Sequence, residues 1–215
     1  MAMKLLLTAF DPFGGEHINP AQEAVKLVRE RIGTVDVVKC EVPTVFGASI
    51  ETVAEAIGRH RPDAVLCIGQ AGGRADLTPE RVAINVEDAS IPDNAGNQPV
   101  DVPVFADGKN AYFSTLPVKA MVAAIREVGL PASLSNTAGT FVCNHLMYGV
   151  LYTLEKHYPG VRGGFLHVPY IPAQVAGGRG IPTMSLPDIV RGIEAAIGAI
   201  GAQETDISVA EGATH

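Results

Sequence analysis

Hydrophobic residues recur along the chain in two alternating patterns: short β-branched runs, and longer segments in which apolar residues follow helical spacing. The short runs predict strands at residues 4–9, 35–42, 64–68, 82–86, 132–135 and 163–168. The longer segments predict helices at residues 21–31, 48–59, 117–128, 144–157 and 187–200. In the first helix, Ala21, Ala24, Val25 and Val28 share one face. Asn19 and Pro20 supply its N-cap and first residue.

This order of elements predicts an α/β fold in one catalytic domain spanning residues 1–215. Residues 64–68 are apolar without alternation, which is typical of a strand covered on both faces. The expected architecture is a three-layer sandwich, with a twisted, mostly parallel but mixed sheet flanked by helices. Residues 89–110 are rich in Pro, Asp, Asn and Gly, and predict a long functional loop that includes, at most, a hairpin. From about residue 202 onward the chain turns polar and predicts a frayed tail.

Composition and charge exclude several classes of protein. The net charge is −7 and no run of Lys or Arg exceeds a pair, which argues against a nucleic-acid surface. The apolar runs are too short to span a bilayer, and the first ten residues lack a signal-peptide pattern. The cysteines Cys40, Cys67 and Cys143 match no zinc motif and cannot all pair with one another. We therefore expect a protein of the reducing cytoplasm, with no membrane partner.

The most informative segment runs from the small, turn-prone residues 135–139 to Cys143, at the start of a predicted helix. The positive end of a helix macrodipole stabilises a thiolate, which predicts a lowered pKa for this thiol. His167 follows at the end of a predicted strand, and a thiol with an imidazole is what a cysteine nucleophile needs. The carboxyl ends of parallel strands meet at one edge of a sheet, so these segments should converge there.

Other interpretations of these residues remain open. An isolated cysteine is usually a small buried hydrophobic residue, and a lone histidine in an apolar strand is usually a core residue. His145 is a poor partner for Cys143, because neighbouring helix positions point about 100° apart. A carboxylate should orient the imidazole. Spacing does not choose among the candidates, which are Asp63, Asp76, Glu80, Glu87, Asp88 and Asp101.

Two glycine pairs favour a different function. Gly14-Gly15 and Gly72-Gly73 could cradle a phosphate at a helix start, as in a nucleoside- or phosphate-using transferase of similar fold. Neither pair matches a dinucleotide-binding or P-loop motif. A tight turn is the simpler interpretation of Gly14 and Gly15.

Taken together, the motifs resemble the pyroglutamyl peptidase I (pyrrolidone-carboxylate peptidase) family of cysteine exopeptidases. The matching phrases lie at residues 8–20 (TAFDPFGG…NP), 79–85 (PERVAIN), 91–99 (IPDNAGNQP), 138–144 (AGTFVCN) and 164–169 (GFLHVP). They occur in family order across nearly the whole chain. The resemblance implies a triad of Cys143, His167 and Glu80, and a mixed α/β sandwich of the phosphorylase/hydrolase-like kind. It further implies a cytoplasmic homotetramer that removes N-terminal pyroglutamyl residues from small peptides without a metal or organic cofactor.

The residues make chemical sense of that substrate. Pyroglutamate is an uncharged five-membered lactam, so an apolar slot suits its ring, and its N–H and C=O need polar partners. The expected apolar residues are Phe10, Phe13, Phe141 and Val142, and the expected polar ones are Asn19, Thr44 and Gln70, together with backbone amides. The alternative role for Phe10 and Phe13 is ordinary packing under the loop. The expected reaction is acyl transfer through a thioester on Cys143.

One position departs from the family pattern. Before the IPDN phrase, family members commonly carry an arginine thought to act near the oxyanion, whereas this chain has Ser90. Either backbone donors suffice, or Arg81 or another cation substitutes, or turnover is reduced. Two further functions stay open besides the peptidase: the transferase described above, and a non-catalytic pyroglutamyl-binding relative.

Overall fold

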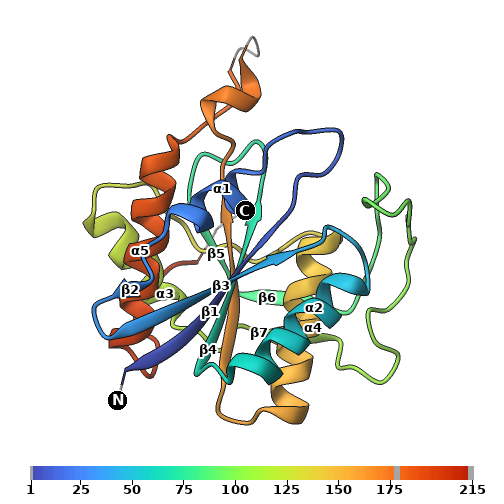
Figure 1. Ribbon diagram of the computed structural model, residues 1–215, viewed down its shortest axis with the longest axis horizontal. Helices are drawn as coiled ribbons and strands as arrows, with labels where there is room; N and C mark the ends of the chain where they lie inside the picture. The colour runs from blue at the N-terminus through green and yellow to red at the C-terminus, as the bar shows by residue number, and fades with distance from the viewer. Residues whose placement is uncertain (1, 177–179, 213–215) are drawn as a thin grey trace.

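The computed structural model describes residues 2–176 and 180–212. In chain order its elements are β1 (Met3–Phe10), α1 (Pro20–Leu27), β2 (Arg31–Ile32), β3 (Val35–Val42), α2 (Ala48–His60), β4 (Ala64–Gln70), β5 (Thr78–Glu80), β6 (Val82–Ile84), β7 (Ala111–Phe113), α3 (Val118–Glu127), α4 (Val142–His157), β8 (Arg162–Val168), the short 3₁₀ helix η1 (Pro172–Val175) and α5 (Leu186–Ala202) (Figure 1).

The main sheet has six strands in the order β2-β3-β1-β4-β8-β5. The four central strands, β3, β1, β4 and β8, run parallel, and the two edge strands, β2 and β5, run antiparallel to their neighbours. The predicted mixed, mostly parallel sheet is therefore confirmed. Because the central strands are parallel, the residues that follow β1, β3, β4 and β8 all emerge at one edge of the sheet.

Helices cover both faces of this sheet, which gives the predicted three layers. Alternate residues of β1 point to opposite faces: Leu5 and Leu7 belong to one hydrophobic core, Leu6 and Phe10 to the other. Figure 1 shows α3 and α5 on one side of the sheet and α2 and α4 on the other, and α1 contributes to the same core as α3 and α5. None of the described helices is long and apolar enough to cross a membrane.

Two predicted strands differ in the structure. The segment predicted at residues 82–86 is shorter and pairs with β7 in a separate two-stranded sheet. Residues 132–135 form only isolated bridges, Leu77 with Ala132 and Glu80 with Ser135. The main sheet instead ends in β5, a three-residue strand that the sequence pattern misses. Its central residue is Pro79, which cannot donate a hydrogen bond to the ladder and is tolerated at a sheet edge.

Helix boundaries also shift. The first helix ends at Leu27 rather than at residue 31, because Arg31 and Ile32 pair with β3 as β2. Its predicted N-cap is confirmed, since Asn19 Oδ1 accepts a hydrogen bond of 3.0 Å from the Ala21 amide. The fourth helix begins at Val142, two positions before the predicted start at 144. Cys143 therefore lies within the first turn of α4.

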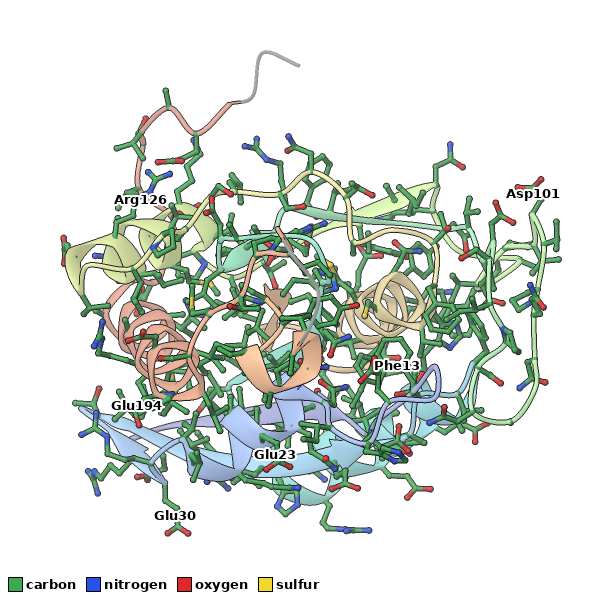
Figure 2. The ribbon with its side chains drawn as sticks, turned by 90° about the horizontal axis from the view of Figure 1, so that it is seen from above. Phe13, Glu23, Glu30, Asp101, Arg126 and Glu194 are labelled. Atoms are coloured by element: carbon green, nitrogen blue, oxygen red, sulfur yellow. The ribbon has the colours of Figure 1, made fainter. Side chains whose placement is uncertain are left out.

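The C-terminal segment after α5 is held in place rather than frayed. Asp206 accepts hydrogen bonds from the Lys119 and Ala120 amides at the start of α3, each 3.0 Å long. Glu211 forms an ion pair of 2.6 Å with Arg126, which Figure 2 shows beside the C-terminal segment. The remaining residues of the predicted tail, 213–215, lie outside the described residues.

The long loop between β6 and β7 forms no hairpin. Within residues 89–110 no strand occurs, and the nearby Glu87 and Val102 form a single isolated bridge. The loop instead reaches toward the edge of the sheet where the central strands end. Asn94 donates to the Pro12 carbonyl and to Asp11, and its own amide donates to the Thr44 carbonyl. The segments after β1 and β3 are thus tied to the long loop.

Candidate active site

His167 and Glu80 form a buried pair on neighbouring strands. His167 lies near the end of β8, Glu80 ends β5, and the carboxylate side chain is 0% exposed. His167 Nδ1 lies 2.7 Å from Glu80 Oε1. An ionised carboxylate only accepts hydrogen bonds, so Nδ1 carries the ring proton. The other ring nitrogen, Nε2, is left as an acceptor, which a general base requires.

Arg74 completes the surroundings of this carboxylate. Its Nη1 lies 2.7 Å from Glu80 Oε1 and 2.7 Å from Thr78 Oγ1. Its Nη2 donates over 3.1 Å to the Thr137 carbonyl, in the turn that leads to α4. A buried charge is stable only when it is paired, and the guanidinium supplies that partner.

Gly69 lies between the Cys143 thiol and the strand that carries His167. In the parallel register of β4 and β8, Gly69 lies opposite His167. A Cβ atom on Gly69 would meet Cys143 Sγ at 3.0 Å and the Phe165 ring at 2.7 Å. The thiol therefore occupies the space above this glycine, beside the histidine strand. In the described residues no hydrogen bond joins Cys143 to His167, a contact that often tightens only when substrate binds.

The electrostatics of Cys143 differ from the sequence-based prediction. Burial of the thiol, together with the nearby Glu80 carboxylate, raises the pKa of Cys143 to about 12, and Arg74 opposes this rise. The predicted lowering of the pKa is therefore wrong for this structure, because loss of hydration and the Glu80 charge outweigh the Arg74 charge. A thiol with a raised pKa needs a base to take its proton before it can attack a carbonyl carbon, and His167 lies opposite Gly69, above which the sulfur sits.

The first turn of α4 is anchored by Asn144. Its Oδ1 accepts from the Ile84 amide, and its Nδ2 donates to the Ile84 and Val86 carbonyls, each over 2.9 Å. This fully buried amide holds the helix start against β6 and the segment that follows it. Phe141 is the N-cap residue and supplies no side-chain cap. The first backbone N–H groups of α4 therefore remain available to a ligand.

An aromatic cluster lies near Cys143, around Phe141 at the start of α4. The centroid of the Phe141 ring lies 6.0 Å from that of Phe13 and 5.5 Å from that of Phe46. The Phe141 and Phe46 rings meet edge to face. Phe13 sits on the loop after β1, beside α4 in Figure 2. Phe10 lies deeper: it is 2% exposed and packs against Phe165 in the core. The cluster provides an apolar wall of half-buried rings at the edge where Cys143 lies.

The expected polar residues mostly have partners already. Asn19 caps α1 and also donates to the Asp11 carbonyl, and Thr44 Oγ1 donates to the same carbonyl over 3.0 Å. Gln70 accepts a hydrogen bond of 2.8 Å from Gln174 on η1. Val142, also expected in the pocket, is fully buried. No group of three or more metal-ligating side chains occurs among the residues described.

Comparison with known proteins decides the family. A model described as pyroglutamyl peptidase matches residues 3–203. The chain is 57% identical to the pyrrolidone-carboxylate peptidase of Clostridium botulinum (strain Alaska E43 / Type E3) over 210 residues, 98% of this chain and 99% of that protein. It is 59% identical to that of Streptococcus pyogenes serotype M4 over 215 residues, 99% and 100% of the two chains. The chain belongs to the pyroglutamyl peptidase family.

Solved structures of the family share this fold. The pyroglutamyl peptidase I of Bacillus amyloliquefaciens superposes with a TM-score of 0.95 at 48% identity, covering 98% of this chain and 100% of that one. The pyrrolidone carboxyl peptidase of Thermococcus litoralis superposes with a TM-score of 0.92 at 33% identity, covering 97% and 99%. The predicted fold class is confirmed at the level of the whole chain.

The pyroglutamyl peptidase fold also brings together residues for which the sequence predicts no role in the site. His145 Nε2 accepts from the Gly47 amide over 2.8 Å, and its Nδ1 lies 2.6 Å from Glu87. His145 therefore holds the loop after β3 by a hydrogen bond and is not directed at Cys143, as its helix position predicts. Asp93 accepts from the amides of Phe46, Ala95 and Asn97. Arg74, Asn144 and His145 adjoin recognised motifs, but their roles depend on long-range contacts that no local pattern reports.

Proposed function

We propose that the chain is a cysteine exopeptidase that hydrolyses the bond after an N-terminal pyroglutamyl residue. Cys143 is the nucleophile, His167 the general acid and base, and Glu80 the group that orients the imidazole. One arrangement supports the assignment of roles. Glu80 accepts a hydrogen bond from Nδ1 of His167, His167 lies opposite Gly69 in the sheet, and the Cys143 sulfur lies directly above Gly69. Family membership supports the substrate, since the curated relatives are named pyrrolidone-carboxylate peptidases.

The reaction is acyl transfer in two steps. Cys143 gives its proton to His167 Nε2 as the sulfur attacks the pyroglutamyl carbonyl carbon. The C–N bond then breaks, and the imidazolium returns the proton to the leaving amine, which leaves a thioester on Cys143. Water attacks the thioester with His167 as base, releasing pyroglutamate and regenerating the thiol. Glu80 stabilises the imidazolium in both steps.

The start of α4 supplies the groups that stabilise the oxyanion. The N-cap residue Phe141 leaves the first-turn N–H groups uncapped, and they lie beside Cys143. Such donors stabilise negative charge that develops on the substrate oxygen, and losing one costs about 10²–10³ in rate. Asn144 keeps this turn in place through its three hydrogen bonds.

The aromatic cluster accounts for the preference for a lactam. Phe13, Phe46 and Phe141 form an apolar wall, on which an uncharged five-membered ring loses little hydration. A free α-ammonium group on the same wall would be buried without a carboxylate partner. Backbone amides and the remaining hydrogen-bonding capacity of Gln70 are the candidates for the lactam N–H and C=O. Phe10 contributes from the core, and Asn19 and Thr44 act by shaping the loop after β1.

We also propose that the enzyme forms a homotetramer in the cytoplasm. The three cysteines are free, which fits a reducing compartment. The small β6–β7 sheet exposes Phe113 (66%) and Ile84 (37%), and the long loop exposes Val100 (65%). Apolar side chains of this size on a surface favour contact with another copy. Sedimentation of the purified protein and of Phe113→Ser tests the assembly, which should weaken in the variant.

Substrate choice is the test of the function. The purified chain is assayed with a chromogenic pyroglutamyl amide, with the matching prolyl amide that carries a free amine, and with a nucleoside plus inorganic phosphate. We expect turnover of the pyroglutamyl amide alone, unchanged after dialysis against a chelator. Turnover of the nucleoside would favour the transferase. Binding of pyroglutamyl amide without release of the chromophore would favour a non-catalytic relative.

A further inference from the structure

We propose that Arg74 is a positioning residue of the catalytic site, which fixes the Glu80 carboxylate against His167 and ties it to the turn before Cys143. The inference rests on the proposed function for the meaning of these groups, and on hydrogen bonds of the structure for their arrangement. Arg74 lies on the segment between β4 and β5, and it contacts Thr78 and Glu80 of β5 and Thr137 in the turn before α4.

The first contact determines which oxygen of Glu80 faces the histidine. Arg74 Nη1 and His167 Nδ1 both lie 2.7 Å from Oε1, whereas Oε2 is buried and has no hydrogen-bond partner among the described residues. Thr78, two positions earlier on β5, accepts from the same nitrogen and so holds the guanidinium in place. With Arg74 present, the carboxylate has one strongly favoured orientation, and that orientation serves His167.

The second contact reaches the nucleophile's side of the site. Nη2 donates to the Thr137 carbonyl, which lies six positions before Cys143. Ser135 Oγ donates to the same carbonyl over 3.0 Å, so the turn is ordered from two directions. A guanidinium presents its donors in a rigid fork, and one side chain can therefore hold both Glu80 and the turn. Lysine, with a single ammonium, cannot serve both positions at once.

The third contribution is electrostatic. The groups that affect the Cys143 thiol are Glu80 from β5, Cys67 from β4 and Arg74, and only Arg74 lowers the pKa of this thiol. A positive charge here favours loss of the sulfur's proton during attack. Many ion pairs on protein surfaces contribute little. This pair differs, because the Glu80 side chain is 0% exposed while that of Arg74 is 31% exposed.

That partial exposure makes a chemical test possible. Arg74 borders a surface hollow that is also lined by Asp76, Thr78, Ser133 and Ser135. A small cation from solution can enter at this point when the side chain is removed. The variants are Arg74→Ala, Arg74→Lys and Arg74→Met, and the matched control is Arg29→Met, which removes the exposed ion pair with Glu194.

We expect Arg74→Met to lower kcat by roughly 10- to 100-fold with little change in KM. A loss of this size is typical when a group that orients a functional histidine from behind is removed, as in metal sites. The rate at which iodoacetamide alkylates Cys143 should fall at a fixed pH. The pH at which this rate increases should be higher than in the wild type. Arg74→Lys should recover part of the rate. Guanidinium ions at millimolar concentration should raise the rate of Arg74→Ala and leave the wild type and Arg29→Met unchanged.

Two results would overturn the inference. One is a kcat and an alkylation rate for Arg74→Met within about twofold of the wild type, far below the effect of an outer-shell partner. The other is a loss of activity that neither lysine nor guanidinium restores while alkylation of Cys143 is unchanged, which would show that Arg74 only supports folding. Thermal unfolding of each variant identifies misfolded samples, and Arg74→Lys then carries the comparison. If the wild type cleaves no pyroglutamyl amide, the proposed function fails, whereas the alkylation rates still test Arg74.

Discussion

His167 Nδ1 and Glu80 Oε1 lie 2.7 Å apart, and the histidine's partner comes from an edge strand that runs antiparallel to its own. This relationship leaves Nε2 as the basic nitrogen. The carboxylate thus determines the tautomer on which the proposed reaction depends.

Replacing this carboxylate should remove most of the activity. In Glu80→Gln the amide can donate to Nδ1, which would place the ring proton on Nε2 and leave no base for Cys143. We expect kcat to fall by up to roughly 10⁴-fold, the loss known for the equivalent change in a serine protease triad. Steady-state kinetics should show KM nearly unchanged. Glu55→Gln, on an exposed face of α2, is the control and should retain full activity.

Gly69 should tolerate no side chain. A Cβ atom there would lie 3.0 Å from Cys143 Sγ and 2.7 Å from Phe165, so Gly69→Ala must displace the nucleophile or the ring that packs against His167. A misplacement of about 1 Å can cost 10²-fold in rate, and we expect a loss of that order. Gly198→Ala is the matched control, because nothing lies within 4 Å of its added methyl group. That helix substitution should stabilise the protein by up to about 1 kcal/mol and leave kcat unchanged.

Asp93 should make the stability of the long loop depend on pH. Burial alone would raise the pKa of Asp93, but hydrogen bonds from Asn97, Phe46 and Ala95 outweigh it and lower this pKa. A lowered pKa means that the contribution is complete above the unfolded-state value, about 3.9, and is lost as the pH falls through the folded-state value. We expect Asp93→Asn to lower the free energy of unfolding by about 1–3 kcal/mol at pH 7.

Denaturant unfolding at several pH values measures this effect. The difference between wild type and Asp93→Asn should shrink as the pH falls below the unfolded-state pKa of about 3.9, and it should vanish only below the lower folded-state pKa, where Asp93 is protonated. A difference that stays constant down to pH 3 would contradict the account.

Ser90 should permit turnover without the arginine common in the family. The residue is exposed on the loop after β6, and the uncapped N–H groups of α4 remain as oxyanion donors. We expect the wild type to be active, and Ser90→Arg to change kcat by less than about tenfold, or 1.4 kcal/mol. Ser90→Ala shows whether the hydroxyl contributes. A folded wild type without detectable turnover, made active by Ser90→Arg, would mean that the cation is essential.

The sequence predicts the layers well and marks a candidate nucleophile, because both leave local patterns. The parallel core strands are continuous apolar runs, and Cys143 follows a turn and opens an amphipathic segment. The place of Glu80 is harder to predict, since β5 has three residues with a proline at its centre, and its pairing with β8 bridges more than 80 positions. The six candidate carboxylates could not be separated by spacing, and the resemblance to the family singled out Glu80.

Other features depend on contacts that no periodicity encodes. Burial and the Glu80 charge raise the pKa of Cys143, and the thiol lies in the space above Gly69; these surroundings exist only once the sheet has formed. Arg74 reaches the turn at Thr137 across 63 positions, and Asn144 reaches Ile84 across 60. The C-terminal segment is polar and glycine-containing, yet Asp206 and Glu211 bind it to α3.

The most direct test of the central claim is the turnover of a chromogenic pyroglutamyl amide by the wild type, Cys143→Ser and Cys40→Ser, measured side by side. Cys40 is a half-buried cysteine of β3 and serves as the matched control. We predict cleavage by the wild type and Cys40→Ser, and a loss of more than about 10³-fold in Cys143→Ser, as for removal of a covalent nucleophile. Wild-type turnover by Cys143→Ser would contradict the account, because the acyl group would then be carried elsewhere.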